Sequence, residues 1–165
     1  MKARRSHMTS IAALVLAGSL GARTGGASAD VADDVLLGVV RGERPDVNWR
    51  RQVVRGDFTG DGERDVAVLG SNDTSVVVAV VVGPLGDGSE FVSHSLPIGP
   101  EGISSECVER ASLRSEPIVI PRDLDDGRKR PPSQKGLRIG RPPCAVVHFY
   151  WDPSSRWFVT WQAPQ

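Results

Sequence analysis

Five oxygen-bearing side chains recur at every second position of one short segment, and they are the residues of this sequence best suited to chemistry. They are Asp57, Thr59, Asp61, Glu63 and Asp65. Calcium takes six to eight hard oxygen ligands, which no single side chain supplies. A tight loop gathers them when carboxylates stand at positions 1, 5 and 9, a hydroxyl at position 3, and a backbone carbonyl, here that of Glu63, at position 7. The segment therefore predicts a Ca²⁺ site.

The loop is not that of an EF-hand. An EF-hand requires a bidentate Glu at position 12, and Val68 stands there. Apolar alternation after Asp65 indicates a strand, and Gly62 permits the sharp turn before it. The alternative is a surface turn rich in Asp and Gly that needs no metal. Calcium is favoured because three acids in one small loop repel each other without a cation.

Residues 56–68, with the sequence GDFTGDGERDVAV, resemble the calcium loop of FG-GAP/VCBS repeats, found in integrin-type β-propeller blades and many secreted bacterial proteins. The resemblance implies a loop between two antiparallel strands. Its side-chain ligand positions fall on Asp57, Asp61 and Asp65, and its carbonyl position on Glu63. Thr59 departs from the Asp or Asn usual at its position, so we expect weak affinity, with a dissociation constant of about 10⁻⁴–10⁻³ M.

The first 29 residues have the pattern of a secretory signal peptide. A basic start at 1–5 precedes an apolar run at 11–20, and Ala27-Ser28-Ala29 forms a small-x-small cleavage signal before Asp30. A membrane span is the alternative, but ten apolar residues are half of the roughly 20 that a span needs. We therefore expect a signal peptide at 1–29 and one secreted or periplasmic domain at 30–165, without a membrane span.

The predicted mature chain is mildly acidic. Of the 20 basic residues, Lys2, Arg4, Arg5 and Arg23 lie in the signal segment, which contains no acid, so 16 basic residues face 20 acidic ones, a balance of about −4. Such a chain has no overall electrostatic attraction to nucleic acid. We therefore expect no nucleic-acid partner.

Cys107 and Cys144 are the two cysteines of the chain. In an oxidising compartment an even pair usually forms a disulfide. This one would stabilise the fold by about 4 kcal/mol in the chain-entropy model. Thiol catalysis and metal ligation are the alternatives, but the sequence has no Cys-x-x-Cys and no His near either cysteine.

Short β-branched runs separated by turn residues predict an all-β fold, either an antiparallel meander or a small sandwich. The expected strands are 50–55, 65–69, 75–82, 91–96, 118–120, 145–151 and 156–161. A short helix over 30–41 precedes them, and an exposed loop over 121–135 carries a basic cluster diluted by nearby acids. A full propeller needs at least four blades of about 40 residues, more than the 136 (165 − 29) available.

Details of packing follow from the same patterns. Helical spacing places Val31, Val35, Leu36 and Val39 on the apolar face, with Asp30 and Asp33 as possible caps. The apolar run 76–82 is expected in the middle of the sheet with both faces covered.

Six of the nine aromatic residues fall in the last predicted hairpin. Strand alternation places Trp157, Val159 and Trp161 on one face and Phe158 and Thr160 on the other. We expect these aromatic side chains to form the core, so that Trp157→Ala would cost about 3–5 kcal/mol. The alternative is an exposed platform for a sugar ring.

The leading functional hypothesis is a non-enzymatic calcium-binding module with an unknown protein or glycan partner. One alternative is an extracellular metal-dependent hydrolase, in which His94 or His148 would approach the acidic loop, because catalytic zinc prefers His nitrogen. The other is a glycan-binding module that uses Trp157 and Trp161. The position of the histidines and the exposure of the tryptophans separate these hypotheses.

Overall fold

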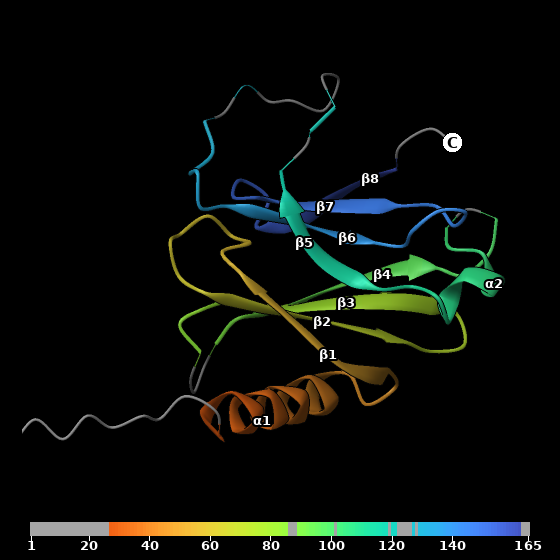
Figure 1. The fold of residues 1–165 in the computed structure, drawn as a ribbon, viewed down its shortest axis with the longest axis horizontal. Helices are drawn as coiled ribbons and strands as arrows, with labels where there is room; N and C mark the ends of the chain where they lie inside the picture. The colour runs from red at the N-terminus through yellow and green to blue at the C-terminus, as the bar shows by residue number, and fades with distance from the viewer. Residues whose placement is uncertain are drawn as a thin grey trace, which may run out of the picture.

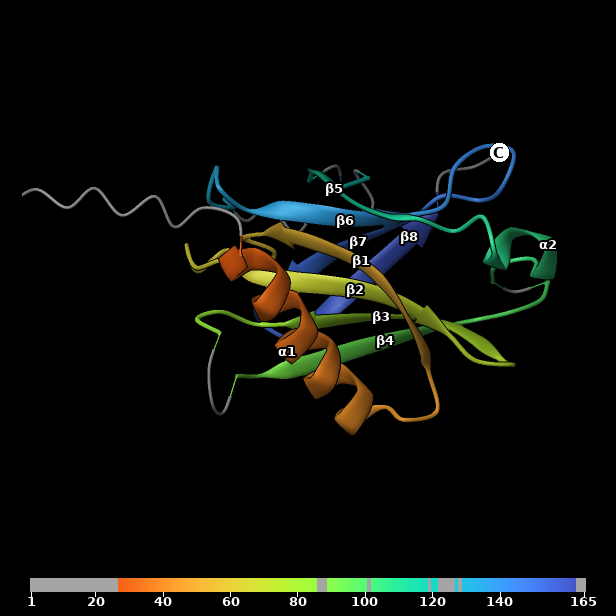
Figure 2. The same ribbon diagram turned by 60° about the horizontal axis from the view of Figure 1, so that its bottom comes forward.

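The two sheets of this protein pack face to face, and a helix covers the far side of one of them (Figures 1 and 2). The computed structural model describes residues 27–85, 89–100, 102–118, 120–121, 127 and 129–162. Over these residues the chain forms two four-stranded antiparallel sheets, each a simple meander. The all-β, sandwich-like architecture predicted from the sequence is confirmed, and it is not a propeller.

The elements follow one another in the order of the sheets. The first sheet contains β1 (Asn48–Gly56), β2 (Asp65–Ser71), β3 (Ser75–Val81) and β4 (Phe91–Pro97). The second contains β5 (Leu113–Pro117), β6 (Lys135–Ile139), β7 (Val147–Asp152) and β8 (Trp157–Gln162). Helix α1 (Ala27–Glu43) precedes the first sheet, and the single turn α2 (Ser105–Val108) connects the two.

Strand β3 has no polar alternation because both of its faces are covered. It lies between β2 and β4, and its side chains divide between two cores. Those facing the second sheet are Val76, Val78 and Val80, and those facing α1 are Val77, Ala79 and Val81. The prediction of a central, doubly covered strand is confirmed.

Helix α1 is longer than predicted, and its buried face is turned by one residue. The buried side chains are Leu36, Leu37 and Val40, whereas Val39 is 45% exposed. This i, i+1, i+4 set is the stripe that meets the first sheet. Placing Val39 on the apolar face was therefore wrong.

The start of α1 also differs from the prediction. The helix spans Ala27–Glu43, so Asp30 and Asp33 lie within its range and not at its first residue. Asp33 instead pairs with Arg55 of β1. Apart from its last three residues, the predicted signal peptide lies outside the described residues.

The prediction was least accurate around the first half of the second sheet. Of the expected strand at 118–120, residues 118 and 120 lie outside any strand, because β5 ends at Pro117, and residue 119 lies outside the described residues. Strand β6 was not predicted, and it begins at Lys135, the last residue of the expected loop. Its two basic residues, Lys135 and Arg138, made the segment resemble an exposed loop in the sequence. Leu137 and Ile139 of the same strand are nevertheless fully buried.

The C-terminal hairpin forms as expected, but only part of it is core. Phe149, Trp151 and Phe158 are buried between the sheets. Trp157 is 46% exposed, so its assignment to the core was wrong. It pairs with Asp152 at the end of the hairpin, on the opposite face of β8 from Phe158.

Candidate functional site

The acidic loop, residues 57–64, joins β1 to β2 as predicted. The two strands are antiparallel and the pair Gly56–Asp65 closes the hairpin. Gly60 and Gly62 have φ values of +82° and +90°. This left-handed conformation is readily adopted only by glycine, so the turn depends on both residues.

Asp65 is the anchor of this loop. Its side chain is fully buried, and its Oδ2 accepts hydrogen bonds from the backbone N–H of Phe58 (2.7 Å) and of Thr59 (2.9 Å) and from the Thr59 hydroxyl (3.2 Å). Its Oδ1 accepts from the N–H of Gly83, 2.9 Å away. Burial raises the pKa of Asp65, although these donors act in the opposite direction. The four donors compensate a carboxylate removed from water.

The other two carboxylates also accept backbone hydrogen bonds. Asp57 accepts from the N–H groups of Gly60 (2.6 Å) and Gly62 (3.2 Å), and Asp61 accepts from that of Glu63 (2.8 Å). Such short-range bonds are the reason why Asp favours turns. Asp57, Asp61 and Asp65 of the predicted calcium set therefore each accept hydrogen bonds from N–H groups of the protein itself.

Together these positions do not fit a calcium shell as the structure arranges them. Among the described residues, no three His, Cys, Asp or Glu side chains come together to hold a metal ion. A shallow hollow of about 460 Å³ beside the loop is lined in part by the basic residues Arg55 and Arg64. Calcium needs six to eight oxygens, and fully buried Asp65 already accepts four hydrogen bonds. Calcium binding remains a prediction of the sequence.

The acidic loop instead forms hydrogen bonds with residues at the start of β6 in the second sheet. The N–H of Lys135 donates to the carbonyl of Asp57 at 2.8 Å, and Gln134 Nε2 donates to the carbonyl of Phe58 at 3.3 Å. A Cβ atom on Gly60 would lie 2.9 Å from the Gln134 side chain. Nothing in the sequence indicates this contact, because Gln134 is 76 residues from Phe58.

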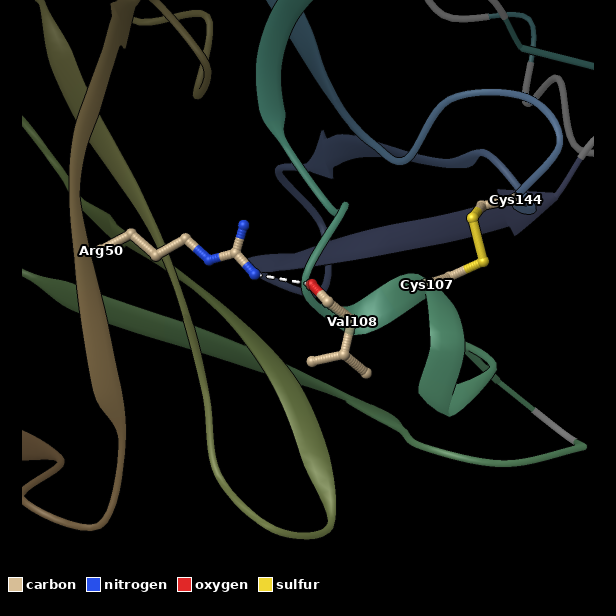
Figure 3. The surroundings of a disulfide bond; sticks show 4 residues. All are labelled: Arg50, Cys107, Val108 and Cys144. Carbon is tan, nitrogen blue, oxygen red and sulfur yellow. Dashed lines mark hydrogen bonds between the residues drawn. A yellow bond between two sulfur atoms is a disulfide. The ribbon is translucent and has the colours of Figure 1, made fainter.

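A second set of contacts joins β1 to the segment that connects the two sheets (Figure 3). Arg50 of β1 donates to the carbonyl oxygens of Val108, at 2.6 Å, and Ala111. Next to this contact, Cys107 and Cys144 form the predicted disulfide, with their Cα atoms 5.8 Å apart. Both cysteines are thus accounted for, and neither is a free thiol.

One row of side chains crosses the whole second sheet, and we call it the outer-face row. It consists of Arg114, Arg138, His148 and Trp161, which pair in register from β5 to β8. These positions alternate with the buried Leu113, Leu137, Ile139, Val147 and Phe149, so they face away from the core. Helix α1 lies on the other sheet, and α2 lies at one end of the sandwich (Figure 1).

The outer-face row is held in a defined geometry. His148 Nδ1 lies 2.5 Å from Glu116 Oε1, and the imidazole stacks on the Trp161 indole with centroids 4.1 Å apart and planes 11° apart. Arg138 Nε lies 3.8 Å from the other oxygen of Glu116. Sequence reasoning missed this cluster because its members are far apart in the chain, with 32 residues separating Glu116 from His148.

The contacts of His94 and His148 lie outside the acidic loop. His148 contacts Glu116 and Trp161, while His94 lies against Phe149 (5.6 Å between ring centroids) and Trp157 (6.2 Å). Burial lowers the pKa of His94. The approach of a histidine to the loop, which the hydrolase hypothesis requires, is not among these contacts.

The fold and these two regions define an antiparallel β-sandwich with one covering helix. In comparisons with protein-family models, with curated protein sequences and with solved structures, none matched this chain. The likeness of residues 56–68 to an FG-GAP/VCBS loop therefore rests on that segment alone. Within the described part of the chain, the helices are too short or too polar to cross a membrane.

Proposed function

We propose that this chain is a secreted or periplasmic, non-enzymatic binding module whose ligand contacts the outer-face row. The observation that carries the proposal is the register of Arg114, Arg138, His148 and Trp161 across four strands. Side chains held on strands are more rigidly positioned than side chains on loops, which favours a binding role.

The two sheets differ in how their faces are used, and this difference supports the proposal. Both faces of the first sheet are used for packing, one against the second sheet and one against α1. The outer face of the second sheet carries ionisable and aromatic side chains instead. Part of that face is covered, since Tyr150 is buried with the Arg130 guanidinium 5.3 Å from its ring.

Two further observations bear on compartment and on catalysis. A disulfide is typical of proteins in oxidising compartments. His148 and Glu116 resemble a general base with its orienting carboxylate, but the contacts of His148 are a carboxylate and an indole, neither of which is a hydroxyl or thiol nucleophile. A non-enzymatic role therefore suits this cluster better. Calcium is not part of the proposal.

Retention on immobilised extracellular polysaccharides and peptides tests the proposal. We expect the native protein to be retained on at least one of them without altering it, and Trp161→Ala to lose most of that retention. Trp157→Ala is the matched control, because Trp157 is an exposed tryptophan of the same strand outside the row. Failure to bind any of them, equal retention of both variants, or chemical turnover of the ligand would refute the proposal.

A further inference from the structure

We infer that strand β4 is a dimerisation edge, along which two copies of this chain pair antiparallel, so that their first sheets become one continuous sheet. The inference is independent of the proposed function, because β4 belongs to the first sheet and the outer-face row to the second.

The backbone groups of β4 alternate between β3 and the outer edge of the sheet. Strand β4 pairs with β3 and is the last strand of its sheet (Figure 2). The N–H of Val82 donates to the carbonyl of Glu90, and the N–H of Ile98 donates to that of Thr74, both at 2.9 Å. Between these points the register is unbroken, and hydrogen-bonded pairs recur at every second residue of an antiparallel ladder. The even-numbered residues of β4 therefore bond β3, and the odd-numbered residues direct their N–H and C=O groups outward.

The open part of this edge runs from Phe91 to Ser95. The carbonyl of Pro97 also points outward, but it accepts a hydrogen bond from the N–H of Ile103 at 2.9 Å, which closes that end. Within the described part of the chain, the outward backbone groups of Phe91, Ser93 and Ser95 have no hydrogen-bond partner. A row of such groups is a template for pairing with another strand.

The edge of β4 lacks the features that normally prevent such pairing, which are charges, prolines and bulges. Strand β1 carries three arginines and a register shift, and β5 carries an arginine, a glutamate and a proline. Strand β4 has no Asp, Glu, Lys or Arg, its pairing with β3 has no shift, and its proline lies at the closed end.

The open edge is complementary to itself. A two-fold axis at Ser93 places Ser93 opposite its symmetry mate and Phe91 opposite Ser95 of the second copy. Each of these three pairs exchanges two hydrogen bonds, so the interface gains about six. Serines that face each other across strands also hydrogen-bond, and the phenyl ring faces a small side chain. An uncharged edge meets its own copy without repulsion, which favours a second copy over a charged peptide as the partner.

Sedimentation equilibrium of the native protein at rising concentration measures the association. We expect a monomer–dimer equilibrium that Ser93→Pro weakens about tenfold or more, because proline removes one N–H from each copy and thus two intermolecular hydrogen bonds. The N–H of Ser93 points outward, so the β3–β4 ladder keeps its bonds. Ser93→Ala retains the N–H and is the matched control. Melting temperatures verify that both variants are folded.

Cysteine cross-linking tests the register independently. The Cα atoms of a hydrogen-bonded pair are about 5.5 Å apart, within the range of a disulfide. Ser93→Cys should therefore form a covalent dimer under mild oxidation, detected by non-reducing electrophoresis. Ser95→Cys is the matched control. It lies on the same face of the same edge, but four residues along the strand, about 14 Å, separate it from its symmetry mate.

Three results would overturn the inference. The first is a monomer at every concentration up to about 1 mM. The second is a dimer that Ser93→Pro does not weaken, because it would use another edge, such as that of β8. The third is cross-linking of Ser95→Cys as readily as of Ser93→Cys. The proposed function stands or falls separately, since its variants lie on the second sheet.

Discussion

The acidic loop and the outer-face row use ionisable side chains in opposite ways. The carboxylates of Asp57 and Asp65 point to backbone N–H groups within their own hairpin. In the row, His148 and Trp161 stack on each other across strands on the face away from the core. The loop thus uses its polar groups for folding, whereas the row holds its polar groups on the outer face of the second sheet.

This difference separates the motif with the strongest sequence signature from the face that we propose binds the ligand. Acids and glycines at close spacing determine a local turn, and local hydrogen bonds suffice to explain them. A binding face on a sheet is assembled by strand register, so its members are distant in sequence.

Asp65→Ala should have the largest effect on stability. The substitution leaves the N–H groups of Phe58, Thr59 and Gly83 without their acceptor, and each unsatisfied buried donor costs about 1–3 kcal/mol. We expect the free energy of unfolding in urea to fall by about 5 kcal/mol. Asp61→Ala is the control and should cost no more than about 1 kcal/mol, because exposed Asp61 accepts one bond. Equal costs would show that Asp65 does not anchor the loop.

Removing the disulfide should have the second-largest effect on stability. The double variant Cys107→Ala/Cys144→Ala opens a loop with a sequence separation of 37, which predicts a loss of about 4 kcal/mol in the chain-entropy model. Urea unfolding measures the loss. Thiol titration of the denatured native protein should find no free thiol, and two titratable thiols per chain would contradict the structure.

The two faces of β8 should differ in their sensitivity to truncation. Phe158→Ala removes a buried ring packed against Trp151 and should cost about 3–5 kcal/mol. Trp157→Ala should cost about 1 kcal/mol or less, because this ring is half-exposed. Thermal unfolding of both variants checks the contrast. A larger loss for Trp157→Ala would restore its earlier assignment to the core.

A smaller effect concerns His94, which is half-buried between the sheets. Its pKa is lowered from 6.5 by burial, so the unfolded chain binds a proton more readily than the folded one. Stability should therefore fall as the pH drops below about 6.5. His94→Gln should remove this part of the pH dependence. An NMR titration in which the His94 ring has a midpoint at or above 6.5 would contradict the prediction.

Most of the first sheet could be predicted because its signals are local. The valines of β3, the turn glycines of the acidic loop and the paired cysteines each follow from a short pattern or from compartment. Strand β6 was missed because Lys135 and Arg138 mask a short buried run. The contacts of Gln134 with Phe58 and of Glu116 with His148 could not be predicted, because they depend on register between distant strands.

We propose that the acidic loop is closed by its own backbone N–H groups and that the ligand binds elsewhere on the molecule. The melting temperature of the native protein in EDTA and in about 2 mM calcium tests it most directly. A site with a dissociation constant of about 0.1 mM would add roughly 1.8 kcal/mol of stability, and our account predicts no shift. A rise in melting temperature that Asp61→Ala abolishes and Glu63→Ala preserves would contradict the account and establish the calcium loop predicted from the sequence.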